Sequence, residues 1–219
     1  MSALIADTVR LRKGDWLIQS VTTHGEAVGF IRRHHYSRSA PNTSTYRHGL
    51  WRDDPAIRPL VADLLGVALW IPPTRAAAET VADDWQGVLS LSRFAVHPDA
   101  PPNAASFLLG GSMRLIDRGR WPVLLTYADT NQGHSGGIYK ATNWECLGEV
   151  PAGDVWLSPT GEQRGRKRGG KTLVRTQMVA AGYEQVPAAP KIKFVHRVYG
   201  HRRVPASVPA RIVGSISDG

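Results

Sequence analysis

The segment from residue 88 to residue 128 has a helix-like pattern between two strand-like patterns, and this order constrains the fold more than any other feature. VLSLSRFAVHP (88–98) alternates and then becomes apolar, as a central strand does, and VLLTYA (123–128) has the composition of a buried strand. NAASFLLGGSMRLIDRG (103–119) has helical periodicity, with Asn103 at the N-cap position. The order predicts an α/β domain built around a mixed sheet.

Further strands and helices are predicted on both sides of this unit. A helix is expected over residues 23–35, because Thr23 and Glu26 have the capping-box spacing. Residues 72–85 are expected to be a polar excursion, and 164–175 a basic loop. Short helical pieces are expected at 133–144 and 172–183, and further strands at 16–21, 45–52, 64–71, 145–150 and 191–200.

The excess positive charge is confined to the C-terminal part of the chain. Residues 162–203 contain eleven Lys or Arg and two Glu, so this segment carries the whole net charge of +9. Its dense basic run also contains glycines, which let a loop follow a polyanion closely. This combination favours a contact with phosphates, although a solubilising surface loop is the alternative. The residues expected to bind nucleic acid are Arg164, Arg166, Lys167, Arg168, Lys171, Arg175, Lys191 and Lys193.

Hydrophobicity and cysteine content exclude several protein classes. The apolar runs are far shorter than the roughly 18 residues of a membrane-spanning helix, and the N-terminus lacks the pattern of a secretory signal. We therefore expect a cytoplasmic protein without a membrane partner. Cys146 is the only cysteine, which excludes an internal disulfide framework and a cysteine-based zinc cluster. Cys146 is expected to be a buried packing residue.

A ligand site is expected where the central strands end. FAVHPDAPPNAAS (94–106) leads from a strand into a helix N-terminus, where unsatisfied N–H groups suit an anion such as a pyrophosphate. TYADTNQGH (126–134) leaves the next strand. FIRRHHYS (30–37) ends the first helix, where Arg33 and His34 are expected to cap the negative end of the helix dipole.

The order of LSRFAVHPD (91–99), AASFLLGGSMRLI (104–116), VLLTYAD (123–129) and GIYKATNWECLG (137–148) resembles the core of the GNAT acyltransferase fold. This resemblance implies one domain with a mixed central sheet flanked by helices, here with a basic C-terminal extension. Together with FIRRHHYSRSAPN (30–42) and KIKFVHRVYG (191–200), these motifs are similar to the Mom DNA-modification proteins of bacteriophages. That family attaches a carbamoylmethyl group to adenine in phage DNA and so blocks host restriction.

The resemblance also implies a small-molecule group donor of the acyl-CoA class. Its expected contacts are Phe94, Val96, Asn103, Ala104 and Ser106. The chain departs here from the usual Gly- or Ala-rich pyrophosphate loop, because Pro101 and Pro102 have no backbone N–H to donate. The identity of the donor is therefore open.

Four residues are candidates for catalysis. Asp129, at the end of a buried strand, can act as a base or hold the target amine, and its alternative role is a helix cap. Tyr139 lies where the acyltransferase fold keeps a tyrosine that protonates a leaving thiolate, and its alternative role is packing against the sheet. His35 can relay a proton or bind a metal, and Tyr36 can stack on the target base or form a hydrogen bond with it.

Three residues, Ser37, Tyr127 and Asn131, are expected to contact the substrate. A metal site is a weaker hypothesis: His35, Asp129 and His134 together have the ligand types of a site with two histidines and one carboxylate that binds iron. No local metal-binding spacing supports this hypothesis. The oligomeric state is not indicated by the sequence.

The predicted organisation is a catalytic core over residues 1–160, a basic nucleic-acid-binding segment with the closing strand over 161–203, and a tail over 204–219. The predicted function is transfer of a small acyl-derived group, similar to carbamoylmethyl, to the exocyclic amine of adenine in DNA. Two alternatives remain. One is an acyl-CoA-dependent N-acyltransferase that acts on RNA, protein or a small amine, and the other is a nucleic-acid-binding module without catalysis.

Overall fold

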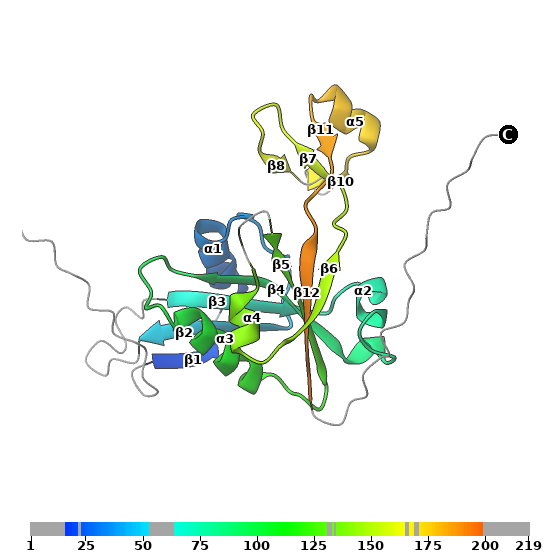
Figure 1. Cartoon of the computed structure of the whole chain (residues 1–219). Helices are drawn as coiled ribbons and strands as arrows, with labels where there is room; N and C mark the ends of the chain where they lie inside the picture. The colour runs from blue at the N-terminus through cyan, green and yellow to red at the C-terminus, as the bar shows by residue number, and fades with distance from the viewer. Residues whose placement is uncertain are drawn as a thin grey trace, which may run out of the picture.

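A seven-stranded mixed sheet forms the centre of the protein (Figure 1). The computed structural model describes residues 16–21, 23–52, 64–130, 133, 135–164, 167–168 and 171–198. The strand order is β1-β2-β3-β4-β5-β12-β6, and β4 and β5 form a parallel pair between antiparallel neighbours. The strands are β1 (Trp16–Ser20), β2 (Tyr46–Arg52), β3 (Leu64–Ile71), β4 (Val88–Val96), β5 (Val123–Asp129), β6 (Glu145–Val150) and β12 (Lys191–Arg197).

Helices cover both faces of this sheet. On one face, α1 (His24–His34) buries Phe30 and Ile31 in a cluster with Leu69 of β3. On the other face, α3 (Ala104–Leu115) buries Leu109 in a cluster with Trp70 of β3. Because successive strand residues point to opposite faces, Leu69 and Trp70 assign the two helices to opposite layers. The predicted α/β class with a mixed central sheet is confirmed.

The N-cap of α1 bonds as predicted, whereas the predicted N-cap residue of α3 makes no side-chain bond. Thr23 is the N-cap of α1, and its Oγ1 accepts a hydrogen bond from the Glu26 backbone N–H at 3.1 Å, as predicted. Asn103 is the N-cap of α3, but its side chain makes no capping hydrogen bond. The start of α3 is instead fixed by the Ala104 N–H, which donates to the Pro101 carbonyl.

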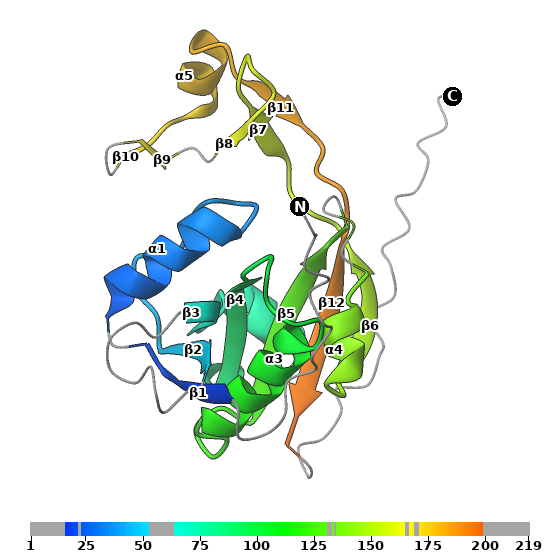
Figure 2. The same cartoon turned by 90° about the vertical axis from the view of Figure 1, so that its left-hand side faces the viewer.

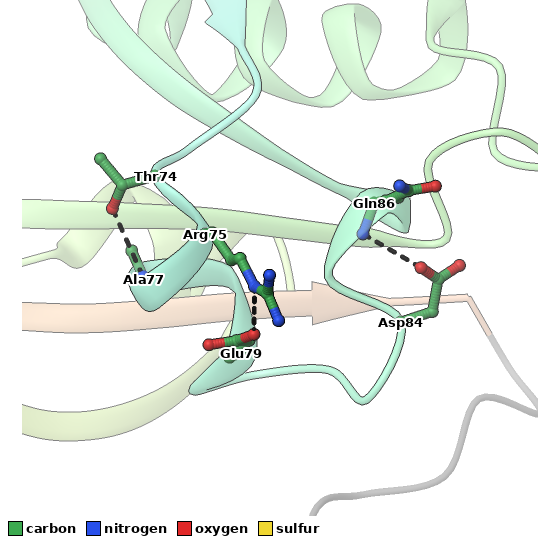
Figure 3. Close-up of polar contacts among 6 residues, drawn as sticks. All are labelled: Thr74, Arg75, Ala77, Glu79, Asp84 and Gln86. Carbon is green, nitrogen blue, oxygen red and sulfur yellow. Dashed lines mark hydrogen bonds and ion pairs between the residues drawn. The ribbon is translucent and has the colours of Figure 1, made fainter.

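The polar segment 72–87 contains two short helices, α2 (Arg75–Glu79) and η1 (Trp85–Gly87), which sequence analysis did not predict. Side-chain oxygens cap both of them: Thr74 Oγ1 accepts from the Ala77 N–H at 3.4 Å, and Asp84 Oδ1 accepts from the Gln86 N–H at 3.0 Å (Figure 3). An exposed ion pair at 2.6 Å joins Arg75 and Glu79 across one turn of α2. Local polar contacts therefore stabilise helices that have little apolar periodicity.

An arm, residues 155–186, is inserted between β6 and β12 and projects away from the main sheet on the side of α1 (Figures 1 and 2). Within the arm, the side chains of Trp156 and Met178 are buried. The predicted boundary at residue 160 falls inside this arm, and the predicted tail lies outside the described residues. The arm consists of β7 (Val155–Leu157), β8 (Gln163–Arg164), β9 (Lys167–Arg168), β10 (Lys171–Thr172), α5 (Arg175–Ala180) and β11 (Glu184–Val186).

The structure also bears on the environment of Cys146 and on membrane-spanning helices. Cys146 is exposed on β6, so the prediction of a buried packing residue was wrong. The reason is that β6 is the outermost strand of the sheet and most of its residues are exposed. Among the described residues, no helix combines the length and the apolar character that crossing a membrane requires.

A buried polar network links β2, β3 and α3. The Ser112 Oγ accepts a hydrogen bond from Trp70 Nε1 at 2.7 Å and lies 2.7 Å from His48 Nδ1. A hydroxyl oxygen can accept two hydrogen bonds and donate one, so Ser112 can bond to either tautomer of the neutral His48 ring. Burial lowers the pKa of His48 from 6.5 to about 4.

We expect His48 to make the protein less stable in acid. Between pH 6.5 and pH 4 the unfolded chain protonates this histidine and the folded chain does not, so stability falls as the pH decreases through this range. The full shift corresponds to a loss of at most about 3 kcal/mol. Urea unfolding of the wild type and of His48→Gln at pH 7 and pH 5 measures the effect. The same pH dependence in both proteins would contradict the prediction.

Candidate active site

An extra residue in β4 opens the central sheet. Trp70 of β3 pairs with Leu91, but the preceding Leu69 pairs with Arg93, so Ser92 forms a β-bulge. The parallel pairing of β4 with β5 covers only residues 88–90 and 123–125, and the strands part beyond it toward the top of Figure 2. A bulged strand bends and changes the direction of its side chains. The bulge therefore coincides with the point where the two strands separate.

A cavity of about 570 Å³ occupies this opening. Its volume lies within the usual range for small-molecule sites, about 300–1,000 Å³. Its walls come from the end of α1, from β4 beyond the bulge, from the end of β5 and from α4 (Gly137–Ala141). The predicted catalytic residues His35, Tyr36, Asp129 and Tyr139 all line it.

Tyr36 and Asp129 form a hydrogen-bonded pair at the α1 side of the cavity. The Tyr36 hydroxyl donates to Asp129 Oδ2 at 3.1 Å. Partial burial raises the pKa of Tyr36 to about 12, and the Asp129 carboxylate adds to the rise, whereas Arg93 opposes it. Tyr36 therefore stays protonated near neutral pH. A carboxylate held by this phenol can accept a hydrogen bond or a proton from an incoming amine.

Arg93 is a site residue that the sequence prediction missed. Its Nε donates to the Ser39 carbonyl and its Nη1 to the Ser92 carbonyl, both at 2.7 Å. These bonds attach the loop after α1 to β4. Burial lowers the pKa of Arg93, and the Tyr36 phenol acts in the opposite direction. The sequence could have indicated this residue, because Arg93 lies inside a mostly apolar strand and a charged side chain is rarely buried there without a partner.

His35 shapes the loop that carries Tyr36. It is the C-cap of α1, and its Nδ1 accepts a hydrogen bond from the Ser37 N–H at 3.1 Å. Its ring stacks on Tyr36 with a centroid distance of 4.3 Å. Because Nδ1 is the acceptor, the neutral ring carries its proton on Nε2. Ser37, predicted to contact substrate, is absent from the cavity lining and bonds to the His35 ring.

His34 lies with Arg33 in the last turn of α1, at the negative end of the helix, where the sequence placed it. It lines the cavity, and its ring packs against His97 with a centroid distance of 4.8 Å. Burial lowers the pKa of His34, and His97 and Arg33 contribute to the shift. His35 is the C-cap residue, and the helix ends at His34, one residue before the predicted end at residue 35.

Tyr139 closes the opposite side of the cavity. It lies on α4, where Gly136 at the N-cap has φ 75°, and an added Cβ there would lie 2.2 Å from the Phe194 ring. Only glycine combines this backbone angle with such a close contact. Thr126 Oγ1 lies 3.4 Å from the Tyr139 oxygen and donates to it. Burial raises the pKa of Tyr139, which keeps the phenol protonated near neutral pH.

Only part of the predicted donor site lines the cavity. Phe94 and Val96 do so, but Asn103, Ala104 and Ser106 do not, and Ala105 takes their place. The Ala104 N–H and the Ser106 hydroxyl are both used within the helix start, since they donate to the Pro101 and Asn103 carbonyls. Both donors are therefore already bonded within the first turn of α3.

The remaining small-molecule contacts are partly outside the described residues. Tyr127 lines the cavity, and burial raises its pKa. Asn131 and His134 are not described, so the proposed substrate contact and the hypothetical iron site of His35, Asp129 and His134 are not tested. Among the described residues, no three His, Cys, Asp or Glu side chains are grouped so that they could hold a metal ion.

Most of the predicted nucleic-acid contacts belong to the arm. Its backbone carries Arg164, Lys167, Arg168 and Lys171 on the short strands β8 to β10 and Arg175 on α5, whereas Arg166 is not described. Lys191 and Lys193 lie on β12 of the main sheet.

Lys193 requires a correction. It is only 7% exposed, its ammonium group contacts Thr80 Oγ1, and burial lowers its pKa. Its ammonium therefore does not face a surface that phosphates can reach, and we do not retain it as a phosphate contact. The alternation of β12 turns Lys193 toward the layer of α2, which was not predicted as a helix.

The pair formed by Tyr36 and Asp129 gives a direct prediction. Asp129→Asn removes a negative charge, so the pKa of Tyr36 should decrease from about 12 toward its ordinary value of 10 while burial keeps it above that value. NMR titration of ring-labelled tyrosines, with Tyr36→Phe to assign the signal, measures this shift. Asp83→Asn, a change at an exposed aspartate, is the control. An unchanged Tyr36 titration in Asp129→Asn would exclude the pairing.

Known proteins resemble this chain at two levels. The Mom protein family matches residues 15–186. The methylcarbamoylase Mom of Escherichia phage Mu is 27% identical over 124 residues, which cover 54% of this chain and 48% of that protein. The chain thus spans about half the length of this curated relative.

Among solved structures, the ribosomal-protein-S5-alanine acetyltransferase from Vibrio fischeri has a TM-score of 0.51 at 8% identity, covering 89% of this chain and 99% of that one. The ribosomal-protein-S18-alanine N-acetyltransferase from Escherichia coli has a TM-score of 0.49 at 10% identity, covering 83% and 93%. The first similarity confirms the predicted GNAT-like fold. Because the family match extends over most of the sequence, the chain belongs to the Mom protein family.

Proposed function

We propose that this chain is a transferase that moves a small acyl-derived group, similar to carbamoylmethyl, to the exocyclic amine of adenine in DNA. The observation that carries the proposal is the cavity between β4 and β5, with the Tyr36–Asp129 pair at one side and the Tyr139 phenol at the other. Membership of the Mom family, with a relative named as a methylcarbamoylase, supports this choice of reaction.

The cavity suits an extended donor of the acyl-CoA class. Beyond the bulge, the facing edges of β4 and β5 no longer pair with each other, so their backbone groups can bind the amides of an extended pantetheine-like arm. Phe94, Val96 and Ala105 would contact that arm. When bound, a thioester donor would supply an activated carbonyl carbon and a thiolate leaving group, so the group first joined to the amine nitrogen would be an acyl group. The altered start of α3 leaves the other end of the donor unassigned.

Residues of this chain would accept and donate the protons that the transfer requires. Asp129, fixed by the Tyr36 hydroxyl, accepts the proton that the adenine amine loses as its nitrogen bonds to the donor carbon. Tyr139 gives its phenolic proton to the departing thiolate, whose bond to that carbon breaks. Arg93 keeps the loop of Tyr36 in register with β4. No step requires the hypothetical iron ion.

Two basic regions would hold DNA next to the cavity. One is the arm, which carries Arg175 exposed on α5 in addition to the basic residues of its short strands. The other is the end of α1, where Arg32, Arg33 and Arg38 are exposed near the cavity. The arm projects over α1, so both regions lie on one side of the protein (Figure 2). Contacts of this kind give affinity without reading sequence.

Nucleoside mass spectrometry of plasmid DNA from cells that express the protein tests the proposal. The wild type and the Asp83→Asn control should yield a new, heavier deoxyadenosine. Asp129→Asn should reduce it at least about 100-fold, because general acid–base catalysis contributes about 10²–10⁴-fold. Tyr139→Phe should reduce it less severely, since water can protonate a thiolate.

Other outcomes identify the alternatives. If acyl groups were found on RNA, protein or a small amine while the DNA stayed unchanged, that molecule and not DNA adenine would be the acceptor. Soluble protein that binds DNA in a salt-dependent manner but transfers nothing to any acceptor would favour the binding module.

A further inference from the structure

A second, smaller cavity of about 150 Å³ lies at the root of the arm. Its walls come from the two linkers that join the arm to β6 and β12, and from the ends of β5 and β12. Asp129 lines this cavity as well as the larger one, so the two cavities adjoin at this residue. The lining residues are Asp129, Ala152, Gly153, Val155, Ala188, Ala189 and Lys191.

Specific contacts fix the walls of this pocket. Gln185 Nε2 donates to Asp154 Oδ2 at 2.6 Å, which ties the first linker to β11 of the arm. Thr130 Oγ1 donates to the Pro190 carbonyl at 2.6 Å and joins the end of β5 to the second linker. Pro187 and Pro190 also restrict the backbone on both sides of Ala188 and Ala189. The pocket is therefore built by several elements rather than by one loose turn.

The chemistry of the walls suits a flat heterocycle with a polar edge. Alanine, glycine and valine provide small apolar surfaces, and the two charged groups are the Asp129 carboxylate and the Lys191 ammonium. These two residues are direct cross-strand partners in β5 and β12, so their side chains leave the same face of the sheet. A volume of 150 Å³ corresponds to about five waters at about 30 Å³ each, which is too little for a coenzyme.

We propose that this arm-root pocket receives the target purine after it has left the DNA stack. The inference rests on the proposed function and specifies where its acceptor binds. A base within a duplex cannot reach an active site unless it is extruded or single-stranded. In the arm-root pocket the exocyclic amine faces Asp129, while the donor reaches the same carboxylate through the larger cavity. Donor and acceptor thus approach Asp129 from separate pockets.

The position of the pocket also couples DNA binding to base capture. The linkers that form its walls are the same segments that carry the basic arm. Phosphates held by the arm would bring the neighbouring nucleotide to the root of the arm. Lys191 at the edge of the pocket can contact the phosphate or a ring nitrogen of the extruded nucleotide.

Titration with deoxyadenosine monophosphate, followed by NMR of labelled alanine and valine methyl groups, tests the pocket without requiring catalysis. Saturable shifts are expected at Ala152, Val155, Ala188 and Ala189 of the wild type. Ala189→Leu fills the pocket and should weaken binding at least about tenfold. Ala180→Leu is the matched control, since Ala180 is exposed on α5 of the same arm. No saturable shift, or equal binding by Ala189→Leu, would overturn the inference.

Modification in cells separates this inference from the proposed function. Ala189→Leu should lower the yield of modified deoxyadenosine at least tenfold relative to Ala180→Leu, while both variants still bind a coenzyme A thioester analogue. Full modification by Ala189→Leu would reject the pocket and leave the function standing. Nucleotide binding in the pocket without any DNA modification would support the pocket and reject the function.

Discussion

The candidate site depends on one extra residue in a central strand. Ser92 bulges out of β4 two residues after Ser90, the last residue that pairs with β5. Without that residue the two parallel strands could continue their ladder, and side chains would fill the space between them. With the bulge, the strands separate, the cavity opens, and Arg93 turns toward the layer of α1. A single backbone irregularity thus creates both the space for a ligand and the anchor for the loop that carries Tyr36.

The two sides of the cavity are chemically different because they come from opposite layers of the sheet. The α1 side contributes a carboxylate held by a phenol whose pKa is raised to about 12, and this pair is suited to bind and deprotonate an amine. The α4 side contributes a buried phenol, Tyr139, whose raised pKa keeps it protonated. In the proposed reaction, this division keeps the carboxylate that accepts a proton apart from the phenol that donates one. The arm-root pocket extends this division, since it gives the acceptor a separate approach to Asp129.

Local patterns predicted the elements that form this framework. The apolar strands β4 and β5, the helix between them and the Thr23 cap depend on neighbouring residues, so sequence alone was sufficient. The convergence of His35, Tyr36, Asp129 and Tyr139 followed from the family resemblance and could not be derived from spacing. The bulge at Ser92 and the bonds of Arg93 were missed because they depend on strand register, a long-range property. The same limitation explains Lys193, since its burial depends on a helix that lies 113 residues earlier in the chain.

The exposure of Cys146 and the position of the basic residues also depend on the topology of the sheet, because β6 is its outermost strand and the arm follows β6. Composition indicated a phosphate-binding segment, but it did not show that this segment belongs to an arm inserted between β6 and β12. Nor did it indicate that the root of the arm meets the end of β5. Sequence patterns thus identified the chemical groups, whereas the topology of the sheet determines which of them share a cavity.

Calorimetric titration with a non-transferable thioether analogue of an acyl-CoA tests the central claim, that the opening between β4 and β5 holds the group donor. The account predicts one saturable site in the wild type and in Ala76→Trp, a change at an exposed position of α2. Ala105→Trp, which places a large side chain in the cavity lining, should weaken binding at least about tenfold. Absence of binding to the wild type, or equal binding by Ala105→Trp and Ala76→Trp, would contradict it.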